Sequence, residues 1–457
     1  MNLDELFWPD KVAVIGASNK EGKVGNAIMK SLKRKFEGEI FPVNIKEEEI
    51  LGLKAYGSVL DIKKDIGLAI ISLPAKLVPD VVEECGKAGI GNIIVVSAGF
   101  SEAGREELEK KMKETVKKYN MNLLGPNCLG VYNPWNELDT IFNPPERQAR
   151  PDAGSLAFLS QSGAFGAAIL DWFSESNLGL SKFVSYGNRA DIDEADLINY
   201  ISEDEKTDYL IFYIEGVKNG REFFEAAKES KKPILAVKSG RTEKGSSAAT
   251  SHTASLAGKD GVYDGAFKQS DVIRLKSLRE MFNVSKALSF QPLPEGKNIA
   301  IVTNGGGAGV MSTDALIEKG LSLSEFSDKT KDRFKEAVEN GNLPDHATLK
   351  NPVDIVGDAP SERYKKAMEI TLEDENTDLL IVICLFQSPA LDENIVDALE
   401  EMQEKGKPII TIASGGEFTH QMSEKIEERG IPVYQTPEDG AQAVKGLCKC
   451  GERKEEN

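Results

Sequence analysis

Residues 155–171, "SLAFLSQSGAFGAAILD", combine an apolar run, a turn of small residues and the first turns of an apolar helix. Residues 298–314, "NIAIVTNGGGAGVMSTD", repeat the same arrangement. An apolar run that ends in small residues and leads into a helical pattern is typical of a strand and helix in a parallel sheet that is covered on both faces. These two stretches therefore predict two related α/β units.

The repeat continues along the chain in the same order, which favours duplication over a general α/β likeness. The further blocks of the first unit are "NRADIDEAD" (188–196), "DYLIFYIEG" (208–216) and "KKPILAVKSG" (231–240). Their counterparts in the second unit are "NPVDIVGDA" (351–359), "DLLIVICLF" (378–386) and "GKPIITIASG" (406–415).

A third α/β unit precedes these two. Its apolar runs include "KVAVIG" (11–16), "LAIISLP" (68–74) and "NIIVVSAG" (92–99), which alternate with helical patterns. Proline-containing stretches at 143–154 and 289–298 are typical of linkers. We therefore expect an α/β protein with parallel sheets and three domains, at residues 1–142, 151–288 and 297–457.

The composition disfavours several classes of protein. The chain has 457 residues, is 40% hydrophobic and 28% charged, and carries a net charge of −18. This acidic balance disfavours a nucleic-acid or membrane-surface role. The longest apolar runs are no longer than strands, and no secretory signal is visible at the N-terminus. The five scattered cysteines indicate reduced thiols in a cytoplasm, and Cys448 and Cys450 lack a second pair nearby, so no metal site is expected.

The loop "GASNKEGKVG" (16–25) joins the first strand to a helix. Its glycines allow close approach of a pyrophosphate, although the spacing departs from G-x-G-x-x-G. Where an NAD-binding domain usually places an acid, the second strand is followed by Asn44 and Lys46. A cation suits the ribose phosphate of NADP or coenzyme A, and no dehydrogenase acid–base pair supports an NADP oxidoreductase. A solvated lysine on a generic sheet is the alternative.

Two helix starts, at Ser160, Ser162 and Gly163 and at Gly305, Gly306 and Gly307, follow the repeated strands. Small residues there expose backbone N–H groups, which make ready anion sites. A nucleophilic serine is the alternative for Ser162, but the first glycine of G-x-S-x-G is missing. We therefore predict that both helix starts bind phosphate.

One of only three histidines, His252, lies in "GSSAATSHTASLAG" (245–258), a segment with no counterpart in the second repeat. An imidazole is a competent nucleophile near neutral pH, and attack on an acyl phosphate or nucleotide would give a phosphohistidine. The other ring nitrogen then needs an acceptor, and Glu215 follows a buried-looking strand at a position where such sites form. On composition alone, an incidental histidine in a surface loop remains the alternative.

Seven blocks together resemble the alpha subunit of archaeal ADP-forming acetyl-CoA synthetase and, more distantly, that of succinyl-CoA synthetase. The blocks are "GASNKEGKVG", "ISLPA", "VSAGFSE", "GPNCLGVYN", "LSQSGAFG", "YIEG" and "SHTASLAG". The resemblance covers essentially the whole chain. It implies a Rossmann-like CoA-binding domain over 1–142, and two flavodoxin-like ligase domains over 151–288 and 297–457.

The resemblance also implies an activity and its residues. The reaction is acyl-CoA + ADP + phosphate ⇌ acid + ATP + CoA, with acetate as the acid. His252 is implied as the phosphorylated residue, Glu215 as its stabilising partner, and the two helix starts as phosphate sites. The implied CoA site comprises Gly16, Ala17, Ser18, Lys23, Gly25, Lys46 and Pro74, with Asn127 and Cys128 facing the acyl and phosphate site.

The family's nucleotide-grasping domain has no room in this chain. We therefore expect a separate ATP-grasp beta subunit that supplies ADP, ATP and Mg²⁺, in an α2β2 heterotetramer. The functional alternative is a CoA-binding regulatory or sensor subunit without turnover.

Overall fold

The computed structural model describes residues 1–245 and 259–456. The chain divides into two compact units, residues 1–276 and residues 277–457. Besides the short antiparallel pair of β3 (Glu49–Ile50) and β4 (Leu53–Lys54), the first unit holds two sheets of mainly parallel strands, and the second unit holds one parallel sheet. The predicted α/β architecture with parallel sheets is confirmed.

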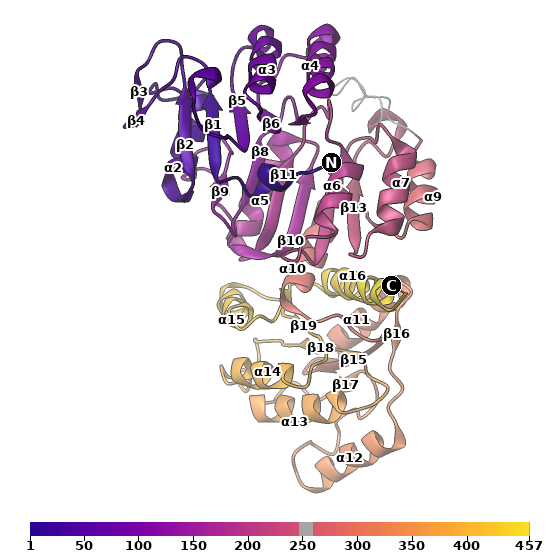
Figure 1. Cartoon of the computed structure of the whole chain (residues 1–457). Helices are drawn as coiled ribbons and strands as arrows, with labels where there is room; N and C mark the ends of the chain where they lie inside the picture. Colours follow the sequence, from indigo (N-terminus) through magenta and orange to yellow (C-terminus); the bar gives the residue numbers. More distant parts are fainter. Residues whose placement is uncertain (246–258, 457) are drawn as a thin grey trace. The chain divides into compact units, whose positions relative to one another are not determined.

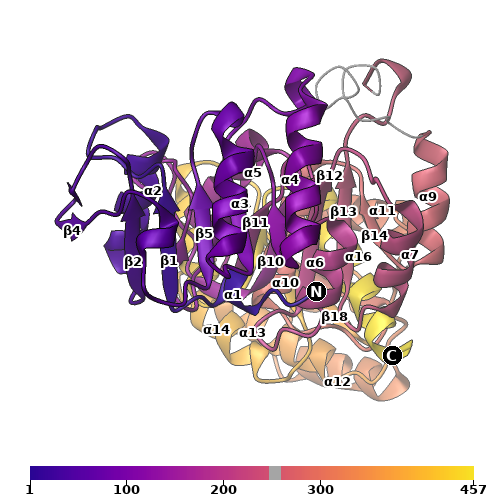
Figure 2. The ribbon, with the colours of Figure 1, turned by 45° about the horizontal axis from the view of Figure 1, so that its top comes forward.

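The first sheet has the order β2-β1-β5-β6-β7, and all its pairings are parallel. Its strands are β1 (Lys11–Ile15), β2 (Glu39–Val43), β5 (Leu68–Ile71), β6 (Asn92–Val95) and β7 (Asn122–Leu124). Side chains on one face, such as Ala13, Ile15 and Ile71, pack with α3 (Val78–Lys87) and α4 (Glu106–Tyr119), which lie side by side (Figure 1, Figure 2). The apolar runs therefore form strands because both faces are covered.

The opposite face of the first sheet shares one apolar core with the second sheet. Val12 and Val14 of β1 and Met29 and Leu32 of α2 (Val24–Lys35) belong to the same buried cluster as side chains of the second sheet such as Leu159. The two sheets of this unit therefore fold around a common core, which fixes the carboxyl ends of their strands relative to one another.

The second sheet has the order β14-β13-β12-β10-β11-β8-β9. Its parallel strands are β10 (Ala153–Ser160), β11 (Leu180–Ser185), β12 (Tyr209–Ile214), β13 (Ile234–Lys238) and β14 (Ile273–Leu275). The helices of this part are α5 (Gly163–Glu175), α6 (Glu194–Ile201), α7 (Gly220–Glu229) and α9 (Asp260–Gln269). We call residues 153–276 the first copy.

Two short strands from the predicted first domain join this second sheet. β8 (Gly130–Asn133) pairs antiparallel with β11, with Val131 opposite Val184, and β9 (Leu138–Asp139) pairs with β8. The segment after β7 thus ties the two sheets together, a crossing that the sequence analysis did not predict.

The second unit is built on a sheet of order β16-β15-β18-β19-β20, with β17 (Val353–Asp354) paired to β15. The other strands are β15 (Asn298–Thr303), β16 (Ser322–Leu323), β18 (Leu379–Ile383), β19 (Ile409–Ile412) and β20 (Val433–Tyr434). Its helices are α11 (Gly306–Glu318), α12 (Asp328–Glu339), α13 (Ser361–Leu372), α14 (Ile395–Gln403), α15 (Glu417–Glu427) and α16 (Pro437–Glu456). We call residues 297–457 the second copy.

The two copies have the same strand order. When the two-residue strand β17 is left out, the parallel strands of each copy run, in chain order, second, first, third, fourth and fifth across the sheet, which is the flavodoxin-like arrangement. The predicted repeat therefore extends from sequence blocks to topology.

Helix α10 (Leu278–Phe290) falls within the second compact unit. The helix packs against α16. Asn283 donates to Asp439 Oδ1 at 2.9 Å, and Lys286 Nζ donates to the Val433 carbonyl at 2.7 Å. These buried polar contacts hold α10 in the same compact unit as α16.

No helix among the described residues is long and apolar enough to cross a membrane. Within the same residues, no cluster of three or more histidine, cysteine or acidic side chains has the geometry to hold a metal ion.

Candidate functional site

A cavity of about 1370 Å³ lies in the first unit, where loops at the carboxyl ends of strands from both sheets meet. Ligand sites of open α/β sheets form at this edge. Eleven of the predicted residues line the cavity: Gly16, Ala17, Ser18, Lys23, Gly25, Pro74, Asn127, Cys128, Ser162, Gly163 and Glu215. The structure thus brings together residues that are up to about two hundred positions apart in the chain.

The glycine loop is shaped by close backbone packing. Gly16 has a φ of +91°, and a Cβ added there would lie 2.5 Å from the Ser72 carbonyl oxygen. A Cβ on Gly25 would lie 1.9 Å from the Gly16 carbonyl oxygen. Only glycine combines this φ with such close approach, which is how loops of this kind bring backbone N–H groups to a phosphate.

Two asparagines hold the same loop from outside. Asn44 Nδ2 donates to the Ala17 carbonyl at 2.8 Å, and Asn26 Nδ2 donates to the Ser18 carbonyl at 2.9 Å. Lys46 is exposed and does not line the cavity, although its N–H donates to Asn44 Oδ1 at 2.8 Å. Of the residues that follow the second strand, Asn44 and not Lys46 therefore contacts the glycine loop.

The start of α5 faces the cavity through Ser162, Gly163 and Ala164. Ser162 is the N-cap, and its hydroxyl accepts from the Phe165 N–H at 3.4 Å. The free N–H groups of the first turn and the positive end of the helix favour an anion here. Ser160 is fully buried and does not line the cavity; its hydroxyl donates to the Ser162 carbonyl at 2.7 Å and so supports the turn.

Glu215 follows β12 and is half-buried at the cavity wall. Its N–H donates to Gln161 Oε1 at 2.8 Å, and the next N–H, of Gly216, donates to the same oxygen at 3.1 Å. Gln161 is the residue between β10 and the Ser162 cap, so one side chain links the start of α5 to Glu215. No role for Gln161 was predicted from the sequence.

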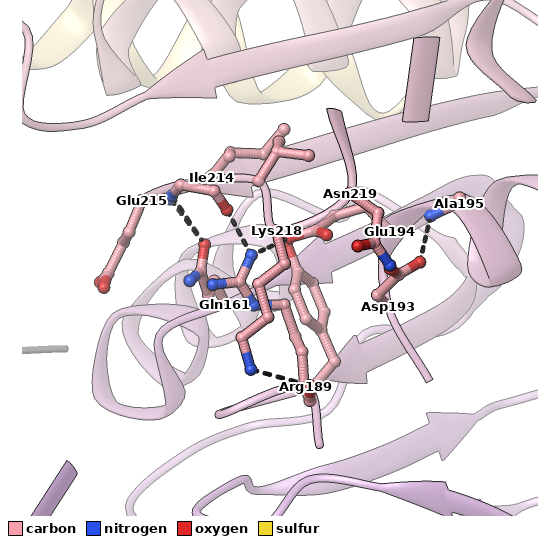
Figure 3. Close-up of polar contacts among 12 residues, drawn as sticks. Gln161, Arg189, Asp193, Glu194, Ala195, Ile214, Glu215, Lys218 and Asn219 are labelled. Carbon is pink, nitrogen blue, oxygen red and sulfur yellow. Dashed lines mark hydrogen bonds and ion pairs between the residues drawn. The ribbon is translucent and has the colours of Figure 1, made fainter. Parts of the chain in front are cut away.

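A second group of residues that sequence reasoning missed lies in "NRADIDEAD" (188–196). Arg189 is buried, and its Nη1 donates to Glu194 Oε1 at 2.8 Å and to the Gly216 carbonyl. Lys218 returns the contact, because its Nζ donates to the carbonyls of Asn188 at 2.6 Å and Arg189 at 2.9 Å (Figure 3). The signal in the sequence was a difference between the repeats: Pro352 and Gly357 stand where the first copy has Arg189 and Glu194.

Burial governs the pKa values of these groups. Burial raises the pKa of Glu194, with Arg189 opposing the shift. Partial burial of the ammonium lowers the pKa of Lys218, although much of that side chain is exposed.

Asn188 connects this group to the first sheet. Its Nδ2 donates to Glu102 Oε2 at 2.5 Å, and its Oδ1 accepts from Asn127 Nδ2 at 3.2 Å. Although burial opposes the shift, hydrogen bonds from the Gly99 N–H, Asn188 and the Phe100 N–H hold the pKa of Glu102 below its ordinary value. Asn188 therefore bridges an ionised carboxylate and a residue of the predicted acyl and phosphate segment.

Cys128 is buried beside Asn127, and burial raises the pKa of its thiol to about 12. Its Sγ donates to the Val95 carbonyl at 3.4 Å. Such a thiol stays protonated near neutral pH, so it can shape the cavity wall but is a poor nucleophile.

The second predicted helix start lies in the second unit. Gly305 is the N-cap of α11, and Gly306 and Gly307 form its first turn. A Cβ on Gly306 would lie 2.6 Å from Asp354 Oδ2, so a carboxylate occupies the space beside this turn. His252, the predicted phosphoryl carrier, lies outside the described residues.

Three family models match consecutive parts of the chain. The CoA binding domain matches residues 10–134, the succinyl-CoA ligase like flavodoxin domain matches 153–288, and the ligase-CoA domain matches 299–451.

Individual relatives match over nearly the whole chain. The alpha subunit of acetate–CoA ligase [ADP-forming] I from Pyrococcus furiosus is 43% identical, with 98% of each chain covered. The 4-hydroxybutyrate–CoA ligase [ADP-forming] of Nitrosopumilus maritimus is 35% identical over 96% of this chain, which spans 63% of that protein. The solved structure of Ca. Korarchaeum cryptofilum dinucleotide forming acetyl-coenzyme A synthetase 1 in complex with phosphate and ADP is 36% identical. It aligns with a TM-score of 0.93 over 99% of this chain and 98% of that one.

Proposed function

Because the chain belongs to the family of ADP-forming acyl-CoA synthetase alpha subunits, within the succinyl-CoA ligase superfamily, we propose that it converts acetyl-CoA, ADP and phosphate into acetate, ATP and CoA through a phosphohistidine at His252. One observation carries the proposal. The glycine loop, the start of α5 and Glu215 line a single cavity, so a thioester, a phosphate and a proton acceptor have places within reach of one another.

The CoA half of the proposal rests on the loop at Gly16–Ser18. Its close-packed backbone and the cation of Lys23 suit the phosphates of CoA, and Pro74 and Asn127 line the path toward α5. CoA bound there would direct its thioester toward Ser162 and Glu215.

In the proposed reaction, phosphate binds at the start of α5, where Gly163 and Ala164 present backbone N–H groups. A phosphate oxygen attacks the thioester carbonyl carbon, the C–S bond breaks, and CoA leaves as a thiolate that takes up a proton. A ring nitrogen of His252 then attacks phosphorus, the P–O bond to the acyl group breaks, and the free acid leaves. In the last step an ADP oxygen attacks phosphorus and the P–N bond breaks.

Glu215 has the role of proton acceptor for the second ring nitrogen of His252. A carboxylate there stabilises the positive charge that the ring carries when it is phosphorylated. The chain otherwise acts by positioning the reactants and by stabilising anions.

The proposal also includes a partner subunit and the acyl group of the substrate. We propose an ATP-grasp beta subunit that brings ADP, ATP and Mg²⁺, in an α2β2 assembly. The relative named as a subunit alpha supports a partner chain, and its acetate–CoA ligase name supports acetate. The 4-hydroxybutyrate relative makes a longer acid the first competitor to assay.

The test is ATP formation by the chain reconstituted with its beta subunit, using a panel of acyl-CoA substrates. Labelled ATP should give an acid-labile, alkali-stable label on the alpha chain, and His252→Ala should abolish both the label and turnover. A label that persists in the variant would refute the phosphohistidine at His252. Tight CoA binding by calorimetry without any turnover would instead support a sensor subunit.

A further inference from the structure

Arg189 is held in an unusual position for its residue type. Its φ is 56°, in the left-handed region that a long side chain seldom adopts. The loop around it is fixed by the Ala190 N–H, which donates to the Gly125 carbonyl at 2.9 Å, and by Lys218, which donates to the Arg189 carbonyl. The surrounding structure therefore imposes this conformation, a feature that is common at functional sites.

The buried Arg189–Glu194 ion pair is not expected to contribute much to the folding stability of the chain. The two side chains are 2% and 1% exposed, and within the described part of the chain each leaves one polar atom without a hydrogen-bond partner, Nε of Arg189 and Oε2 of Glu194. Burying two charges costs desolvation energy that an incompletely bonded pair does not recover. The pair therefore needs a reason beyond folding.

The Arg189–Glu194 pair contacts the segment that carries Glu215. Gln161 accepts from the N–H groups of Glu215 and Gly216, while Arg189 donates to the Gly216 carbonyl from the other side. The backbone beside Glu215 is thus held at both its donors and its acceptor. In Figure 3 the Glu215 side chain extends away from the Arg189–Glu194 pair, so Arg189 acts on the backbone.

The second copy lacks the whole arrangement. Pro352, Gly357, Leu385 and Ser388 stand where the first copy has Arg189, Glu194, Glu215 and Lys218. Because the second copy forms the same sheet without these residues, the fold does not require them. The ion pair and the carboxylate occur together in one copy and are absent together from the other.

We infer that Arg189, paired with Glu194, is a positioning residue that fixes the Glu215 carboxylate for phosphoryl transfer. Through its neighbour Asn188, which bonds to Glu102 and Asn127, the same loop also sets Glu215 relative to the CoA-binding side of the cavity. The inference rests on the proposed function, in which Glu215 is the partner of His252.

The test removes both charges together, in the variant Arg189→Met with Glu194→Gln, so that no unpaired buried charge unfolds the chain. The full chain is assayed with its beta subunit, and we expect kcat to fall about a hundredfold, because misplacement by about an ångström has an effect of this size. KM for acyl-CoA and the calorimetric Kd for CoA should stay within about threefold, since no CoA contact is removed.

A matched control removes another buried pair from the same unit. Arg150 Nε lies 2.9 Å from Asp139 Oδ2, both side chains are 3% exposed, and neither lines the main cavity. The variant Arg150→Met with Asp139→Asn should lose thermal stability but keep kcat. An equal loss of kcat in both variants would overturn the positioning role.

A second readout does not depend on turnover. Hydrogen–deuterium exchange of the peptide covering residues 211–219 should be about tenfold faster in the Arg189 and Glu194 variant than in the wild type, because the hydrogen bond from Arg189 to the Gly216 carbonyl is lost. Unchanged exchange would overturn the inference. If the wild-type complex makes no ATP, the proposed function fails, and exchange alone decides whether Arg189 holds this segment.

Discussion

The two copies share more than a strand order. In the first, Ser160 donates to the Ser162 carbonyl at 2.7 Å; in the second, Thr303 donates to the Gly305 carbonyl at 3.0 Å. The next residue bonds in each copy to the backbone after the third parallel strand, Gln161 to Glu215 at 2.8 Å and Asn304 to Leu385 at 3.0 Å.

What differs is the chemistry at the end of that third strand. The first copy presents Glu215 to a large cavity, and the second presents Leu385, with Asp354 beside the first turn of its helix. The shared hydrogen bonds therefore build a strand–turn–helix frame, and a few substituted side chains decide what the frame can do.

The largest expected effect is the loss of turnover in the variant Glu215→Gln. The neutral amide of glutamine cannot balance the positive charge of the phosphorylated imidazole ring as a carboxylate does. Turnover should therefore fall about a thousandfold, within the range of acid–base contributions. The measurement is ATP formation from acyl-CoA by the reconstituted complex. Glu229→Gln, on the exposed end of α7, is the control and should retain full activity. Activity of Glu215→Gln within a few fold of wild type would remove the chemical distinction between the copies.

The next largest effect concerns the frame. Gln161→Leu leaves the N–H groups of Glu215 and Gly216 without an acceptor, and Asn304→Leu does the same for Leu385. We expect each variant to lose about 2 kcal/mol of unfolding free energy, since an unsatisfied buried donor costs about that much. Urea unfolding of each variant measures the loss. A loss in one copy only would show that the frames are not equivalent.

Much of this frame could be predicted from the sequence, because it depends on local patterns. Apolar runs, small residues after them and helical periodicity indicated the strands, the start of α5 and the position of Glu215. The contribution of Gln161 was not readable, because a glutamine between a strand and a helix has no preferred partner until the third strand is in place.

Other features depend on contacts between distant segments. The pairing of Val131 with Val184, and the packing of α10 through Asn283 and Lys286, follow from tertiary structure and leave no periodic signal. The link between Arg189 and Gly216 spans 27 positions for the same reason. His252, which sequence reasoning placed at the centre of the chemistry, remains a prediction.

A smaller effect is expected for Ser160→Ala. The hydroxyl of Ser160 is buried and bonds to the Ser162 carbonyl, so its removal should cost about 1 kcal/mol of unfolding free energy. Thr303→Val tests the same bond in the second copy with nearly the same volume. CoA binding by calorimetry should be unchanged in both variants, because neither hydroxyl lines the cavity. A large loss of CoA affinity in Ser160→Ala would place that hydroxyl in the site itself.

The smallest effect is expected at two buried thiols, one beside the first copy and one within the second. Burial raises the pKa of Cys128, beside the first copy's site, and of Cys384, before Leu385 in the second, to about 12 in each case. At pH 8 only about one thiol in ten thousand would then be ionised. Because the thiolate is the reactive form, iodoacetamide should label neither cysteine in the folded chain, and activity should survive the treatment. The labelled sites are read by peptide mass spectrometry, with urea-unfolded protein as the control that reacts fully. Rapid labelling of Cys128 alone, with loss of turnover, would mean that the cavity activates a thiol and that the chemical difference between the copies extends beyond Glu215 and the residues that hold it.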